Sequence, residues 1–476
     1  MIKNNYTMMC DFYELTMSNG YLVSDIGDTI TYFDLFYRTV PDAGGFSIAA
    51  GLETVINYIK NIKFYKEDID YLKSKKVFDD RFLEFLSSYK FTGDIYAVEE
   101  GTPIFPNEPI MIVKARAIEA QFIETYVLSS INHESLIATK SNRIVRAALG
   151  RPISEFGARR AHGASSAIQG ARASYIAGCV GTSCVMADRL YDIPATGTMA
   201  HSWVQMFDTE YEAFSAYAKI YPNNTILLVD TYNVINSGVP NAIKVFNDVL
   251  KPLGIRPKGI RIDSGDVAYL SKKARGLLDK AGYTDVLIFV SNSLDEYIIR
   301  DLCFQEAKID AFGVGERLIT SKSSPVFDGV YKLVAIEKNN NILPKIKISE
   351  TTDKITTPHF KKLYRFYDKD NGKAFADLIT VFDEDKPKDE YTLFDPIETW
   401  KRKTVTNFEV KELLIPIFIK GELVYKIPSV KEIRKYCLKE VESLWDEVKR
   451  FENPHKYYVD LSEKLWNVKN DLLKKC

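Results

Sequence analysis

The sequence predicts an α/β protein whose largest part is a closed or nearly closed barrel of parallel strands. Two observations lead to this class. From residue 152 to residue 321, short apolar runs alternate with amphipathic helical segments in about seven successive units. Polar or glycine-rich residues follow nearly every apolar run. Strands that alternate with helices form parallel sheets with right-handed crossovers, and a series of this length favours a barrel over an open sheet.

The first 130 residues predict a smaller N-terminal α/β domain. Residues 29–37 are rich in aromatic and β-branched types, as a strand is, and Asp11 is placed to cap a helix containing Leu15 and Tyr21. Further expected elements are helices within 53–90, short strands within 92–115 and a helix near 118–150. The barrel domain then covers residues 131–345.

Two residues of the N-terminal domain leave alternatives open. Tyr13, in the first expected helix, either packs within the domain or presents its ring to a ligand. Arg38, at the end of the first expected strand, is either a solvated charge or a clamp for phosphate.

Residues 346–476 predict a C-terminal segment with a basic loop and helices. Amphipathic helices are expected near 430–451 and 460–473. Their role is not specified by the sequence, and they pack either on the barrel or on a second subunit.

Composition excludes several classes of protein. The chain has 476 residues, 46% hydrophobic and 27% charged, as in ordinary globular proteins. Its formal net charge is −1 and no strongly basic half exists, so nucleic acid is not an expected partner. Six cysteines without a CxxC pair argue against a zinc site and for a reducing compartment. The N-terminus lacks a signal-peptide core and no apolar run approaches the ~18 residues of a membrane span, so we expect a cytoplasmic protein.

The ends of the expected barrel strands carry the residues that favour an enzyme. In α/β barrels the loops after the strands form the active site, and a purely structural barrel would not need polar and glycine residues there. These residues are Glu155 to Gly157, Thr182, Ser183, Thr198 to His201, Asp230, Thr231, Arg261, Asp263 to Gly265, Ser291, Asn292, and Gly313 to Gly315.

Several residues of this region suit a phosphorylated or acidic substrate. Gly313 and Gly315 follow the last expected strand, where glycines let backbone N–H groups approach a phosphate. Arg261 is suited to gripping a planar carboxylate. Asp263 and Asp266 are placed either to hold ribose hydroxyls or magnesium waters, or to begin the next helix, with Asp263 or Ser264 as its cap and Asp266 in its first turn.

His201 and Asp230 end consecutive expected strands. A single histidine is usually a structural residue, but a neighbouring carboxylate would fix its tautomer and leave the other ring nitrogen basic or nucleophilic. Spacing alone leaves both interpretations open.

Read together, these segments resemble a known family. The motifs CDFYELTM, EFGARRAHG, GTMAHSW, DTYNV, IRIDSGD, VSNSLDE, FGVGERLITS and NPHKYYVDLSEKLW occur in the order found in nicotinate phosphoribosyltransferases. The resemblance implies an irregular α/β barrel of the type II phosphoribosyltransferases with an N-terminal α/β domain. It also implies transfer of phosphoribose from phosphoribosyl pyrophosphate to nicotinate, coupled to ATP hydrolysis with Mg²⁺, in NAD salvage. A homodimer with shared active sites is the implied assembly.

The resemblance also implies roles for individual residues. His201 would be phosphorylated by ATP and oriented by Asp230. The nicotinate ring would lie between Phe156 of the same chain and Tyr13 contributed by a neighbouring subunit. The remaining implied contacts are Arg159 and Arg261 for the carboxylate or pyrophosphate, Asp263 and Gly265 for ribose, Gly313, Gly315 and Thr320 for the 5′-phosphate, and Arg38, Lys361, Lys362 and Arg365 for pyrophosphate.

One segment departs from the family pattern. Members often have Pro-Gly before the lysine, whereas this chain has Pro358, His359 and Phe360. We therefore expect that the turn does not keep the glycine-dependent geometry. A pair of lysines in a loop is otherwise usually solvated charge.

Ser183 bears on the choice of substrate. The related nicotinamide phosphoribosyltransferases, which are generally longer, have an aspartate at the matching position, and that aspartate would repel a carboxylate. Ser183 therefore favours nicotinate. The alternatives are a nicotinamide phosphoribosyltransferase, the much shorter quinolinate enzyme, and a barrel that binds nucleotide without turnover.

Overall fold

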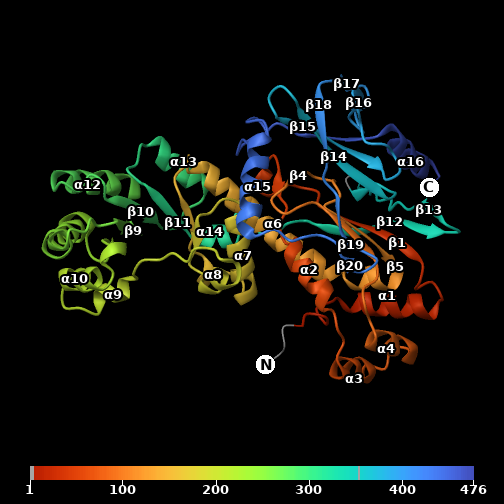
Figure 1. Cartoon of the computed structure of the whole chain (residues 1–476), viewed down its shortest axis with the longest axis horizontal. Helices are drawn as coiled ribbons and strands as arrows, with labels where there is room; N and C mark the ends of the chain where they lie inside the picture. Colours follow the sequence, from red (N-terminus) through yellow and green to blue (C-terminus); the bar gives the residue numbers. More distant parts are fainter. Residues whose placement is uncertain (1–4, 352–353, 476) are drawn as a thin grey trace. The chain divides into compact units, whose positions relative to one another are not determined.

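The computed structural model describes residues 5–351 and 354–475, which fold as two compact units (Figure 1). Unit 1 combines the described residues up to Leu136 with those from Val326 onward, and unit 2 consists of Ile137–Pro325. The described residues from 346 onward, expected as a separate C-terminal segment, therefore belong to unit 1 together with the N-terminal region.

Unit 1 is built on a seven-stranded sheet with antiparallel pairing and the order β13-β12-β1-β5-β3-β19-β20. The expected first strand is confirmed as β1, whose aromatic residues Tyr32 and Phe33 are buried. In sheet order the strands are Asn341–Pro344, Val330–Lys338, Ile30–Phe36, Met111–Arg116, Asp94–Ala97, Ile415–Ile419 and Glu422–Leu423.

A second sheet of unit 1 has the order β18-β14-β15-β21, and only its β15–β21 pair is parallel. These strands are Phe408–Glu412, Lys361–Asp368, Ala374–Val381 and Tyr458–Leu461. The segment expected to be a basic loop thus includes strand β14. Two short strand pairs complete the unit: β2 (Ser47–Ile48) with β4 (Pro103–Ile104), and β16 (Tyr391–Phe394) with β17 (Arg402–Val405).

The helices of unit 1 confirm those expected from sequence periodicity. Asp11 occupies the N-cap position of α1, although its side chain makes no capping hydrogen bond. The helices are α1 (Phe12–Val23), α2 (Leu52–Asn61), α3 (Lys66–Ser74), α4 (Asp80–Ser87), α5 (Ala117–Phe122), α15 (Val430–Ser443) and α16 (Glu463–Lys474). The chain passes into unit 2 within α6 (Glu124–Ala147).

Unit 2 is the irregular α/β barrel predicted from the sequence. Its parallel strands are hydrogen-bonded in the order β7-β6-β11-β10-β9-β8. In that order they are Gly181–Thr182, Ile153–Glu155, Ala311–Val314, Leu287–Ser291, Gly259–Ile262 and Ile226–Leu228. The expected strand that ends at His201 is reduced to one parallel bridge, from Ala195 to Thr182. The residues between this bridge and His201 form no strand, and helix α9 begins at His201.

Helices follow the strands of unit 2, as the alternating pattern predicted. They are α7 (Ala164–Ile176), α8 (Val185–Tyr191), α9 (His201–Gln205), α10 (Glu210–Ile220), α11 (Val239–Val245), α12 (Val267–Lys280), α13 (Glu296–Phe304) and α14 (Glu316–Ile319). Because the strands are parallel, their carboxyl ends meet at one edge, as the pairing of Val314 with Glu155 shows. Within the described residues, no helix is long and apolar enough to cross a membrane.

Candidate active site

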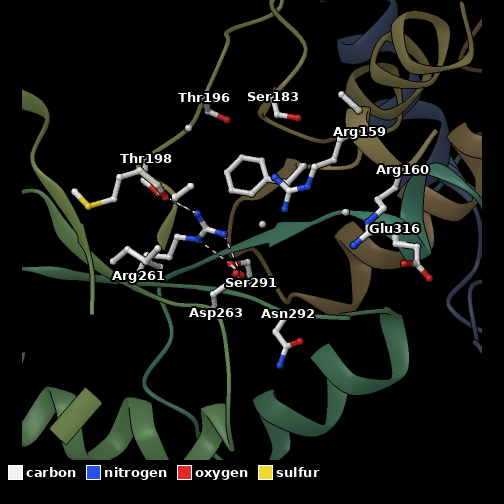
Figure 2. Close-up of a pocket in the computed structure, with 18 of the residues that line it drawn as sticks. Arg159, Arg160, Ser183, Thr196, Thr198, Arg261, Asp263, Ser291, Asn292 and Glu316 are labelled. Carbon is white, nitrogen blue, oxygen red and sulfur yellow. Dashed lines mark hydrogen bonds and ion pairs between the residues drawn. The ribbon is translucent and has the colours of Figure 1, made fainter. Parts of the chain in front are cut away.

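A cavity of about 600 Å³ lies at the carboxyl ends of the unit 2 strands (Figure 2). It is lined by residues of the loops that were predicted from the sequence to follow the barrel strands. These include Phe156, Arg159, Arg160, Ser183, Thr198, His201, Arg261, Asp263, Ser291, Asn292, Gly313, Gly315 and Glu316. The structure thus brings together the expected site residues that belong to the barrel, except for Asp230, Gly265 and Thr320, which do not line this cavity.

Arg261 is held in one orientation by several hydrogen bonds. Its Nε donates to Ser291 Oγ at 2.8 Å and its Nη2 to Asp263 Oδ1 at 3.0 Å. Its Nη1 donates to Thr198 Oγ1 at 3.1 Å and to the carbonyl of Met199 at 3.4 Å. In Figure 2 the guanidinium groups of Arg261 and Arg159 both point into the cavity. A fixed guanidinium is well suited to binding a carboxylate.

Phe156 supplies an aromatic ring beside this guanidinium. The Cζ of Arg261 lies 5.8 Å from the ring centroid. The ring follows β6, where Glu155 is fully buried and accepts hydrogen bonds from Thr182 Oγ1 at 2.6 Å and from the Gly157 amide. Burial raises the pKa of the Glu155 carboxyl. Glu155 therefore fixes the turn that carries Phe156.

His201 contacts two polar residues of neighbouring loops. Its Nδ1 lies 3.1 Å from Thr231 Oγ1 and its Nε2 lies 3.9 Å from Asp263 Oδ2. Its side chain is 41% exposed. The His201–Asp230 contact expected from the sequence is not one of these two, and Asp230 Oδ2 instead accepts hydrogen bonds from the turn after β9.

Asp230 orders the turn after β9. Its Oδ2 accepts hydrogen bonds from the Asp263 amide at 3.0 Å and from Ser264 Oγ at 2.5 Å. Its Oδ1 is buried and has no hydrogen-bond partner in the described part of the chain. The cap of α12 is Asp266, whose side chain accepts hydrogen bonds from the amides of Ala268 and Tyr269. This corrects the expectation that Asp263 or Ser264 is the cap and that Asp266 lies in the first turn.

The cavity lining carries more positive than negative charge. Arg159, Arg160 and Arg261 line it together with Asp263 and Glu316, and Ser183 adds an exposed hydroxyl (Figure 2). A lining of this kind favours an anionic ligand.

The remaining barrel residues of the expected site lie near the cavity. Thr320 lines an adjoining hollow of about 370 Å³ together with Arg160, His162 and Lys322. Its hydroxyl donates to the carbonyl of Glu316 at 2.8 Å. Gly265 has φ +78°, a left-handed conformation that explains why glycine occupies this turn.

The other expected site residues belong to unit 1. Tyr13 is 43% exposed on α1. Burial of its hydroxyl, followed by the charge of Glu124, raises the pKa of Tyr13. The amide of Arg38 donates to Asp328 Oδ1 at 3.1 Å, and its guanidinium lies 5.6 Å from the centroid of the Phe36 ring. Both residues are thus held by contacts within their own unit.

Lys361 and Arg365 lie in the interior of unit 1. The Nζ of Lys361 lies 2.8 Å from Asp34 Oδ2, and the side chain is 1% exposed. Arg365 is fully buried and donates to both carboxylate oxygens of Asp377. Their charges are already engaged, so we leave both residues out of the proposed anion site. Lys362 is half-buried, with its Nζ 4.9 Å from the centroid of the Phe382 ring.

His359 corrects one expectation about the turn before β14. The histidine was expected to prevent the glycine-dependent geometry, yet its φ is +83°. The chain therefore keeps a left-handed residue here without glycine, at a cost of about 1–3 kcal/mol.

Several site residues had no individual role in the interpretation of the sequence. The sequence places Thr198, Thr231 and Ser291 at strand ends, but periodicity does not show which of them contacts Arg261 or His201. Arg160 and Glu316 belong to the recognised motifs EFGARRAHG and FGVGERLITS. Their place in these two motifs is the feature of the sequence that points to a role in the site.

Comparison with known proteins agrees with this geometry. Models of the nicotinate phosphoribosyltransferase N-terminal domain, family and C-terminal domain match residues 8–132, 152–383 and 360–469. A nicotinate phosphoribosyltransferase of Bacillus subtilis is 42% identical over 98% of this chain and 95% of its own length. One from Mycobacterium tuberculosis is 37% identical over 96% of this chain and 92% of its own length.

A solved structure shows the same fold. The crystal structure of human nicotinic acid phosphoribosyltransferase superimposes with a TM-score of 0.86 and 27% identity, covering 97% of this chain and 99% of that one. Family models, relatives and structure agree over nearly the whole length. The chain therefore belongs to the nicotinate phosphoribosyltransferase family of enzymes.

Proposed function

We propose that this chain transfers phosphoribose from 5-phosphoribosyl 1-pyrophosphate to nicotinate, in an ATP-coupled reaction of NAD salvage. The observation that carries the proposal is the Arg261 guanidinium held beside the Phe156 ring inside a cationic cavity. The pyridine nitrogen attacks C1 of the ribose while the bond from C1 to the pyrophosphate oxygen breaks. That nitrogen carries no proton, so the reaction needs no general base at the ring.

Nicotinate is both aromatic and anionic, and the cavity offers a partner for each property. The Phe156 ring provides a face for the pyridine. Arg261 and Arg159 provide positive charge for the carboxylate. Ser183 lines the same space without a negative charge that would repel the acid. The site therefore supports nicotinate better than nicotinamide.

The phosphoribosyl group would occupy the polar side of the cavity. Gly313 and Gly315 line the cavity and are assigned to the 5′-phosphate, and Thr320 and Arg160 line the adjoining hollow. Asp263 is placed for ribose hydroxyls, and Gly265 gives its turn the required shape. Negative charge near the ribose would also stabilise the positive charge that develops on the sugar.

The donor set fits a magnesium ion held mainly by substrate phosphates. Asp230 has a buried carboxylate oxygen with no protein partner among the described residues, and Asp263 lies next to it in the structure. Mg²⁺ commonly takes one or two carboxylates and completes its shell with phosphate oxygens and water. Asp230 and Asp263 would hold the ion, which would neutralise charge on the diphosphate.

ATP coupling is assigned to His201. Its imidazole is partly exposed in the cavity, and contacts at both ring nitrogens restrict its orientation. We assign it as the phosphate acceptor. Asp230 would act on it indirectly, by ordering the turn that places Asp263 opposite Nε2.

A second copy of the chain is part of the proposal. Tyr13 exposes its ring on α1, and Arg38 has a buried Nε without a hydrogen-bond partner in the described residues. By resemblance to the family, these residues would complete the site of a neighbouring subunit in a homodimer.

A substrate panel tests the proposal. Pyrophosphate release from phosphoribosyl pyrophosphate is measured with nicotinate, nicotinamide or quinolinate, each with and without ATP. We expect release with nicotinate, and stimulation by ATP. Release of similar size with nicotinamide would instead favour the nicotinamide enzyme. No release with any pyridine would favour a barrel that only binds nucleotide.

A further inference from the structure

The hydroxyl of Ser291 bridges two charged groups of the cavity. Ser291 is the last residue of β10 and is 5% exposed. Its Oγ accepts a hydrogen bond from Arg261 Nε at 2.8 Å and donates one to Asp263 Oδ1. Figure 2 shows this arrangement at the ends of the neighbouring strands β9 and β10. One hydroxyl thus links Arg261, proposed to bind the nicotinate carboxylate, to Asp263, proposed to bind the ribose hydroxyls.

This bridge limits how Arg261 pairs with Asp263. An arginine beside a carboxylate usually forms two parallel hydrogen bonds with it. Here the direct pairing is a single bond, from Nη2 to Oδ1 at 3.0 Å, and the Nε bond goes to Ser291. The Nη1 group is held on the other side by Thr198 Oγ1 at 3.1 Å. Ser291 and Thr198 together keep the guanidinium from closing onto Asp263.

We propose that Ser291 is a positioning residue for substrate selection, which keeps the Arg261 guanidinium available to the carboxylate of nicotinate. The inference rests on the proposed function. Without the hydroxyl, Nε loses its acceptor, and the guanidinium rotates into a two-bond pair with Asp263. Its charge is then largely neutralised before the substrate arrives. Affinity for an acid falls, whereas affinity for a neutral pyridine changes little.

The test is Ser291→Ala in the full-length chain. The KM for nicotinate, kcat, and the inhibition constant of nicotinamide are measured by pyrophosphate release. We expect the KM for nicotinate to rise about tenfold, while the inhibition constant of nicotinamide stays within about twofold of the parent. Ser291→Thr keeps the hydroxyl and should restore most of the affinity. Thr198→Val removes the Nη1 acceptor and should raise the same KM by a smaller factor.

A second buried serine serves as the control. Ser271 in α12 is fully buried, and its Oγ donates to the carbonyl of Ala268 at 3.1 Å and accepts from the amide of Lys308 at 3.2 Å. It does not line the cavity. Ser271→Ala should lower the melting temperature and leave the KM for nicotinate unchanged, which separates a lost buried hydroxyl from lost positioning.

Two kinds of outcome would overturn the inference while leaving the proposed function standing. In one, the KM of Ser291→Ala for nicotinate stays within about twofold of the active parent. In the other, the KM for nicotinate and the nicotinamide constant rise together. A parent that releases no pyrophosphate with nicotinate would overturn the proposed function, and the inference with it.

Discussion

Gly313 and the ring of Phe156 are in direct contact. A β-carbon built on Gly313 would lie 2.4 Å from Cδ2 of Phe156, closer than such atoms approach in folded proteins. Gly313 lies in β11, and Phe156 directly follows the neighbouring parallel strand β6. The position of the aromatic ring, and its 5.8 Å separation from Arg261 Cζ, therefore depend on the absence of a side chain at residue 313.

Gly313→Ala tests this relationship. The added methyl group must displace the Phe156 ring, and misplacement by about 1 Å can lower kcat/KM by up to about 100-fold. We expect most of the loss as a higher KM for nicotinate, measured by steady-state kinetics. Gly276→Ala is the control, because its β-carbon would meet nothing within 4 Å and it lies in helix α12. Equal kinetics for the two variants would contradict the assigned role of Phe156.

Ser183→Asp tests the charge of the pyridine site. A carboxylate at this position would repel the carboxylate of nicotinate, and we expect a rise of about tenfold or more in the KM for nicotinate. Ser183→Asn adds similar volume without the charge and should have a smaller effect. Unchanged kinetics of Ser183→Asp would remove Ser183 from the substrate site.

His201→Ala tests the coupling to ATP. The variant has no phosphate acceptor, so we expect ATP stimulation to be abolished while slow ATP-independent formation of nicotinate mononucleotide remains. Rates are compared with and without ATP in parent and variant. His455→Ala in unit 1 is a control histidine and should keep the stimulation. Parent-like stimulation of His201→Ala would refute the phosphohistidine assignment.

Arg365→Met tests the structural role assigned to the buried ion pair. The substitution leaves the carboxylate of Asp377 buried without its cation, which should cost about 3–5 kcal/mol of unfolding free energy. Urea unfolding measures the change. Lys362→Met, at a half-buried position of the same strand β14, should cost less than about 1 kcal/mol. An Arg365→Met variant that kept its stability but lost activity would show that Arg365 belongs to the anion-binding site after all.

Glu14 predicts a pH dependence of stability. Burial, together with the charges of Glu124 and Asp11, raises the pKa of its carboxyl from 4.5 to about 8. The folded state therefore binds a proton that the unfolded state releases, and stability falls as the pH rises through this interval. Glu14→Gln cannot ionise, so its stability relative to the parent should increase by roughly 2–4 kcal/mol between pH 5 and pH 9.

Urea unfolding at several pH values provides the measurement for Glu14. Glu409→Gln, at an exposed position of β18, is the matched control and should not change its stability relative to the parent with pH. A pH-independent difference between Glu14→Gln and the parent would show that Glu14 ionises normally in the folded protein.

The sequence predicted the barrel well because burial imposes a pattern on it. Strands such as β8, in which every residue is buried, must be apolar, and the helices between them must be amphipathic. The same logic placed Arg261, Asp263 and Gly313 at one edge. It did not predict that the strand before His201 is reduced to a single bridge at Ala195, because a short apolar run does not fix strand length.

The finer contacts depend on geometry that the sequence does not encode locally. Arg365 and Lys361 read as loop cations, yet each is neutralised by a carboxylate from another strand, Asp377 or Asp34. The His201 partner changed from Asp230 to Thr231 because Asp230 is directed toward the Asp263–Ser264 turn. Asp230 and Thr231 are neighbours in the sequence, and only the fold shows which of them contacts His201.

The product balance of one reaction is the decisive test of the proposed activity. The purified chain is incubated with phosphoribosyl pyrophosphate, nicotinate, ATP and Mg²⁺, and its phosphorus-containing products are followed by ³¹P NMR. We predict nicotinate mononucleotide and pyrophosphate in equal amounts, together with ADP and phosphate, and neither nucleotide nor pyrophosphate when nicotinate is omitted. Pyrophosphate that forms without nicotinate, or no nucleotide at all, would contradict the account.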